Sequence, residues 1–171
     1  RLQRPLDFLV VADHAEGLGA APAIANSDPI MMDTELGRQL VELTKAGKPD
    51  QAFDVWNRAG QGGANPLVTD ERLIRPAWTR MTEIADQFNE PGRFTAFIGY
   101  EWTSNTGGNN LHRVVIYRDN ANRASQMEPY TTLKPLGSDN PRDLWKRMNT
   151  YAEKTADQVL AIAHKGNRSN G

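Results

Sequence analysis

The chain has 171 residues, and its 39% hydrophobic content is sufficient for one ordinary domain with a buried core and argues against disorder. Its 20 Lys and Arg residues balance 21 Asp and Glu residues, so a net charge of -1 gives no general reason to expect nucleic acid or an anionic membrane as partner. The absence of cysteine excludes disulfides, thiolate metal ligands and a cysteine nucleophile.

Four short apolar runs, rich in β-branched residues, are predicted to be strands buried on both faces. They are residues 8–12, 93–100, 113–117 and 159–163. After the first run, residues 15–32 contain several Gly and Pro residues among small side chains, which predicts a long loop.

Helical spacing of apolar residues predicts four helices, three of which lie between the first two strands. They begin at an N-cap on Asp33 or Thr34, near Asp50, near Thr69, and at an N-cap on Ser138 or Asp139. Pro76 should kink the third helix or delay its start. The alternation of strands with helices predicts an α/β fold with a parallel sheet or barrel.

The ends of the chain predict a single domain, residues 1–171, that is a fragment of a larger domain truncated at both ends. The chain begins with Arg1 rather than Met, close to one apolar run, and closes on Gly171 shortly after another. No apolar run approaches the roughly 20 residues that a membrane helix needs. We therefore expect no membrane segment, and the sequence fits a cytoplasmic or an exported protein.

The three histidines of the chain and one glutamate stand at or beside predicted strand ends. His14, Glu101 and His164 each follow an apolar run, and His112 precedes one. Because the carboxyl ends of neighbouring parallel strands meet at one edge of a sheet, these side chains should gather there. His112 would join them if its strand ran antiparallel to the preceding one.

Imidazole and carboxylate ligands suit zinc, manganese or iron, and Glu101 is the expected bridge between two ions. Such a site activates water and stabilises charge on a leaving oxygen, which is the chemistry of hydrolysis. Asp13 would orient His14. Structural alternatives are a turn-forming role for Asp13 and an ion pair of Glu101 with Arg113.

Residues beyond the ligands are weaker candidates. Lys165, Asn167 and Arg168 follow His164 and would bind an anionic substrate group, although a solvated turn explains them equally. Trp102 either lines a pocket or belongs to the core.

Four strings resemble the family called domain of unknown function 3604, which is similar to the polymerase and histidinol phosphatase (PHP) metal-dependent phosphoesterases. The strings are VADHAE at 11–16, GYEWTS at 99–104, NLHR at 110–113 and AHKGN at 163–167. The resemblance implies a portion of a distorted (β/α)7 PHP-like barrel that holds up to three metal ions at the strand carboxyl ends. It implies His14, Glu101, His112 and His164 as ligands, with Glu101 bridging.

The chain also departs from that pattern. The opening His-x-His motif and the closing Asp-x-His motif of the PHP superfamily have no counterpart between Arg1 and Gly171. Lys165 stands where the family usually has an uncharged residue. The fragment would then hold only part of the metal cluster, and its activity would be poor.

The sequence thus predicts a metal-dependent hydrolase that acts on a small-molecule or phosphoester substrate through a metal-activated hydroxide, with catalysis resting on Glu101 and His164. One alternative is a non-catalytic metal-binding or structural domain. Another is a metal-dependent hydrolase of non-phosphate esters or amides, because the same ions polarise a carbonyl group.

Overall fold

The structure is a computed structural model that describes residues 3–61, 65–107 and 109–164, with His164 described by its backbone. The chain divides into two compact units. A sheet unit comprises Arg1–Glu16 and Ala77–Gly171, and a helical unit comprises Gly17–Pro76. Within the described ranges, every helix is too short or too polar to cross a bilayer.

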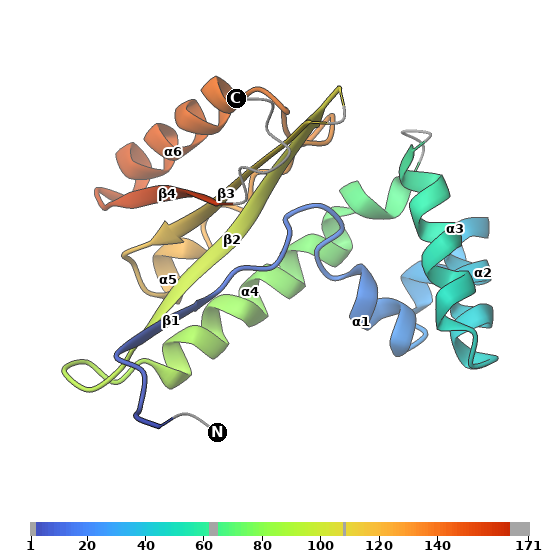
Figure 1. The fold of residues 1–171 in the computed structure, drawn as a ribbon, viewed down its shortest axis with the longest axis horizontal. Coiled ribbons are helices and arrows are strands. Elements are labelled where there is room, and N and C mark those ends of the chain that lie inside the picture. The colour runs from blue at the N-terminus through green and yellow to red at the C-terminus, as the bar shows by residue number, and fades with distance from the viewer. Residues whose placement is uncertain (1–2, 62–64, 108, 165–171) are drawn as a thin grey trace. The chain divides into compact units, whose positions relative to one another are not determined.

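The sheet unit is built on a mixed four-stranded sheet in the order β1-β2-β3-β4 (Figure 1). β1 pairs with β2 in parallel, whereas the β2–β3 and β3–β4 pairs are antiparallel. The strands are β1 (Phe8–Val11), β2 (Thr95–Thr106), β3 (Asn109–Tyr117) and β4 (Val159–His164). The sheet is not closed among the described residues, so the structure confirms a mixed α/β fold and does not confirm the predicted barrel.

The strands were predicted from their apolar runs, and the main difference lies in the β2–β3 hairpin. β2 continues six residues beyond Tyr100, and β3 starts at Asn109, so most of the segment between the two predicted strands, residues 101–112, is paired strand. Gly107 follows Thr106 with a φ of 63°, a left-handed conformation that glycine adopts without steric cost. Antiparallel pairing satisfies the backbone of these polar residues, which apolar content alone does not indicate.

Helices of the sheet unit bury one face of β2 and β3. Trp78 of α4 lies edge-on against Tyr100 at a centroid distance of 6.0 Å, and Tyr151 of α6 lies against Tyr117 at 4.7 Å. All four rings are almost fully buried. The helices of this unit are α5 (Ala121–Ala124), α6 (Pro141–Thr155) and the part of α4 (Glu71–Phe88) from Ala77 onward.

The opposite face of the sheet carries exposed apolar side chains in the described part of the chain. Phe8 is 65% exposed on β1, and Leu160 and Ile162 are about half exposed on β4. The register places these residues on the same face as His14 and Glu101, because paired residues and every second residue of a strand share a face. The prediction of strands covered on both faces is therefore wrong for these exposed residues.

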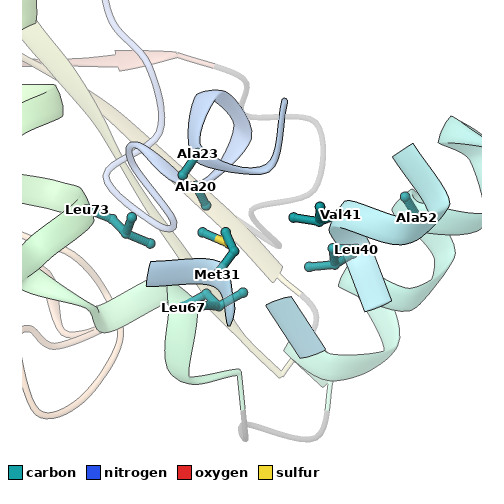
Figure 2. Close-up of a cluster of buried hydrophobic side chains, with 8 residues drawn as sticks. All are labelled: Ala20, Ala23, Met31, Leu40, Val41, Ala52, Leu67 and Leu73. Atoms are coloured by element: carbon teal, nitrogen blue, oxygen red, sulfur yellow. The ribbon is translucent and has the colours of Figure 1, made fainter. Parts of the chain in front are cut away.

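The helical unit has its own apolar core, in which fully buried Met31 lies among seven other side chains (Figure 2). Its elements are α1 (Ala20–Ala25), η1 (Pro29–Asp33), α2 (Glu35–Lys45), α3 (Pro49–Gln61), η2 (Pro66–Thr69) and the first turns of α4. The prediction that residues 15–32 form only a loop is wrong, because the short α1 and η1 occur there. Segments of this length offer too few periodic positions to be recognised.

Helix starts follow the expected capping chemistry in part. The Thr34 hydroxyl accepts a hydrogen bond from the amide of Gly37 at 3.0 Å, which confirms Thr34 as the N-cap of α2. Asn140, not Ser138 or Asp139, caps α6. α4 begins at Glu71, before Pro76, so the proline does not delay the helix.

Candidate functional site

The register of the sheet brings together side chains that are distant in the sequence. His14 pairs with Glu101 and extends the β1–β2 pairing in the same register. Two backbone hydrogen bonds of 2.8 Å hold this pair: the Glu101 amide donates to the Asp13 carbonyl, and the Ala15 amide donates to the Glu101 carbonyl. Thr103 pairs with His112 across the antiparallel β2–β3 ladder. Glu101 and Thr103 are two residues apart, so all four side chains lie on one face.

The backbone register extends this row to β4, where His164 pairs with His112. The antiparallel direction of β3, the condition under which His112 was expected to reach the site, is confirmed. The three histidines and Glu101 therefore occupy neighbouring positions on the β1–β2–β3–β4 ladders.

The Thr103 hydroxyl stands at the centre of the described side chains. Its Oγ1 lies 3.0 Å from Nδ1 of His14 and 3.1 Å from Nδ1 of His112, and it donates to Oε1 of Glu101 at 3.3 Å. Nδ1 of His112 is also hydrogen-bonded to Oε1 of Glu101. One hydroxyl thus links both imidazoles to the carboxylate.

The His14 ring lies between two carboxylates. Its Nδ1 is 3.7 Å from Oε2 of Glu16, and its Nε2 is 3.7 Å from Oε2 of Glu101. The His14 side chain is 54% exposed, whereas those of Glu101 and Glu16 are 13% and 19% exposed. The ring is accessible to solvent and the two carboxylates are mostly shielded.

Two threonines hold the carboxylate of Glu16 in place. Its Oε1 accepts hydrogen bonds from the amide and the hydroxyl of Thr132 at 2.8 and 2.9 Å, and from the hydroxyl of Thr131 at 3.3 Å. These residues belong to the segment between α5 and α6, more than one hundred positions away in the chain. The segment thereby fixes the carboxylate beside His14.

Glu16 and Thr103 were missed as site residues by reasoning from the sequence. Thr103 had a usable signal, since it follows Glu101 by two residues and so shares its face of the strand. Glu16 lies two residues after His14, but its orientation depends on Thr131 and Thr132, which only the folded chain brings near.

The other predicted residues have different outcomes. Asp13 lines an apolar cavity of about 470 Å³ together with Leu9 and Val11 of β1, and its expected role in orienting His14 stays a prediction. Trp102 belongs to the core, with 0% exposure. Arg113 donates to the carbonyl of His112 at 2.8 Å. The predicted substrate contacts Lys165, Asn167 and Arg168 lie outside the described residues.

The donors at the site are the types that divalent metals take. Nε2 of His14 and Oε2 of Glu101 are 3.7 Å apart, a separation that one ion can span because such ligands bind at roughly 2.0–2.2 Å. Among the side chains that are described, no three His, Asp or Glu residues already form a complete metal-binding group. His14 and Glu101 are therefore spaced as two ligands of one ion would be.

Comparison with protein families gives a match over residues 1–171 to the family described as "Protein of unknown function (DUF3604)". Neither the comparison with curated proteins nor that with solved structures found a match. Because the family match extends over residues 1–171, the chain belongs to the DUF3604 family.

Proposed function

We propose that this protein is a metal-dependent hydrolase and that its substrates are phosphoesters. The observation that carries the proposal is the gathering of His14, Glu101 and His112 on one sheet face, with His164 at the next register position. Imidazole and carboxylate groups collected in this way are the usual ligands of zinc, manganese or iron. The four sequence strings resemble the DUF3604 family, and the expected similarity of that family to the PHP phosphoesterases supports the proposal of the same chemistry.

The roles of the residues follow from their contacts. The two oxygens of Glu101 face different partners, with Oε1 near Thr103 and His112 and Oε2 near His14. This carboxylate can therefore reach two positions, as a bridging ligand must. When bound, a divalent ion would polarise a phosphoryl oxygen and lower the pKa of water. Thr103 would hold both imidazoles and the carboxylate in place during substrate binding.

Two other functions share the same residues. A non-catalytic metal-binding domain is favoured by the incomplete ligand set among the described side chains. A hydrolase of carboxylic esters or amides would use the same groups, since a metal ion polarises a carbonyl as well as a phosphoryl oxygen. Turnover assays distinguish these functions from the proposed one.

The first experiment is elemental analysis of the protein purified without chelator, with Glu101→Ala as the test variant. Glu90→Ala is the matched control, because its side chain is 58% exposed and pairs with Arg93 in the turn before β2. We expect the wild type and the control to carry zinc, manganese or iron and Glu101→Ala to lose it. Equal metal content in all three proteins would contradict the proposed site.

The second experiment measures hydrolysis of chromogenic phosphomonoesters, phosphodiesters and carboxylic esters with added Mn²⁺ or Zn²⁺. Hydrolysis of a phosphoester that Glu101→Ala abolishes and Glu90→Ala retains would support the phosphoesterase. Metal binding without any turnover would favour the binding domain, and turnover of carboxylic esters alone would favour the carbonyl hydrolase.

A further inference from the structure

The feature that extends the proposed function is the unequal surroundings of the two nitrogens of His14. Nδ1 faces Thr103 and Glu16, whereas Nε2 faces Glu101. A neutral imidazole carries one proton, so one nitrogen donates and the other offers a lone pair. The hydrogen bonds around Thr103 and the two carboxylates beside the ring act together on which nitrogen carries the proton.

The Thr103 hydroxyl has one proton to donate and two lone pairs. An ionised carboxylate only accepts, so the 3.3 Å bond to Oε1 of Glu101 uses the Thr103 proton. The same reasoning gives Nδ1 of His112 a proton, since it also hydrogen-bonds Glu101. Nδ1 of His14, 3.0 Å from the hydroxyl oxygen, can then donate to it, which leaves the lone pair of His14 on Nε2.

Glu16 reinforces this arrangement electrostatically. Its Oε1 is occupied by Thr131 and Thr132, and its Oε2 is a buried atom without a hydrogen-bond partner in the described part of the chain. That oxygen lies 3.7 Å from Nδ1 of His14, and its negative charge favours a proton on that nitrogen. It thereby offsets the charge of Glu101, whose Oε2 lies at the same distance from Nε2 and favours a proton there. The three hydrogen bonds on Oε1 prevent the carboxylate from turning away.

We propose that Glu16 is a positioning residue that holds His14 in the Nδ1–H tautomer and keeps the lone pair of Nε2 directed toward Glu101. The metal-binding consequence rests on the proposed function, because Nε2 would be the ligand atom. The tautomer itself is a property of the metal-free protein and can be measured independently of any metal.

The first test is NMR of the ¹⁵N-labelled, metal-free full chain, in which the two ring nitrogens of His14 report the tautomer. In Glu16→Gln the amide oxygen can still accept from Thr131 and Thr132, while the negative charge near Nδ1 is removed and that of Glu101 near Nε2 remains. We expect Nδ1–H in the wild type and a shift toward Nε2–H in Glu16→Gln. An unchanged tautomer in the variant, or Nε2–H in the wild type, would overturn the proposal.

Thr132→Val is the matched control, since it removes one hydrogen bond to Glu16 and leaves the negative charge in place. We expect the control to keep the tautomer of the wild type. If Thr132→Val changed the tautomer as much as Glu16→Gln does, the effect would come from the packing of the 131–132 segment, and the assignment to the carboxylate would fail.

The second test measures Mn²⁺ affinity by calorimetry for the wild type, Glu16→Gln, His14→Ala and the double variant. Loss of a group that orients a ligand histidine typically weakens metal binding by about 10-fold to 100-fold. We expect that loss in Glu16→Gln alone and no further loss from it when His14 is absent. An equal loss in both backgrounds would show that Glu16 does not act through His14.

The two tests also separate this proposal from the proposed function. If the tautomer shifts as expected but the wild type binds neither Mn²⁺ nor Zn²⁺, the metal-dependent hydrolase fails while the positioning role of Glu16 stands. If metal binds but the tautomer is insensitive to Glu16, the positioning role fails alone.

Discussion

Trp102 lies between two site residues of β2, and its truncation should strongly destabilise the sheet unit. The side chain is 0% exposed, and its Nε1 donates to the carbonyl of Ser138 at 3.2 Å. Trp102→Ala removes a large buried ring and leaves a cavity, which costs about 3–5 kcal/mol. Trp102→Phe keeps most of the apolar ring but leaves the Ser138 carbonyl without its donor, which costs about 1–3 kcal/mol.

The assay is urea denaturation followed by far-UV circular dichroism. The free energies of unfolding of the wild type and the variants are compared, provided that the slope of the free energy against urea concentration is the same for each protein. Trp145→Ala on α6 is the matched control: the same change is made at a ring that is 39% exposed, with an expected cost of about 1 kcal/mol or less. Equal losses for Trp102→Ala and Trp145→Ala would refute the buried position of Trp102 and the packing of residues near Ser138 against β2.

Three further changes test the helical unit and a buried acid. In Gly37→Ala the new Cβ would lie 2.1 Å from the carbonyl oxygen of Met31, so we expect the free energy of unfolding to fall by about 1–3 kcal/mol. In Gly60→Ala the new Cβ meets nothing within 4 Å, so we expect the free energy of unfolding to rise by about 0.5–1 kcal/mol, because alanine is favoured over glycine inside a helix. Thermal unfolding measures both changes. Burial, followed by the hydrogen bond with Asp157, raises the pKa of Asp119 above its ordinary value. Folding therefore favours protonated Asp119, and this stabilisation is present below the ordinary pKa and is lost as the pH rises through the folded value. Asp157→Ala should lower the pKa of Asp119, as measured by ¹³C NMR of its carboxyl group, and an unchanged pKa would contradict the contact.

The strands and most helices could be predicted because their cause is local. The run that contains Val10 and Val11 is apolar and β-branched, and Thr34 precedes an amphipathic helix as a capping residue should. The extension of β2 through Asn105 could not be predicted in this way. Its polar residues are held by pairing with β3, an interaction between segments rather than a property of either one.

The candidate site shows the same division. The positions of His14 and Glu101 after predicted strands led us to expect them at one edge of the sheet, whereas His112 was expected there only if its strand ran antiparallel to the preceding one. The hydrogen-bond partners around these side chains were not predictable: Thr103 becomes central only through its register with His112, and Glu16 is oriented by the distant Thr132.

The sequence by itself determined the local elements and the kinds of ligand atom available, because propensity, capping and side-chain chemistry act over a few residues. Tertiary structure decided the antiparallel direction of β3, which sheet face is covered, and which oxygen faces which nitrogen of His14. These depend on contacts between residues far apart in the chain, whose distances and directions are specified only when the whole sheet forms.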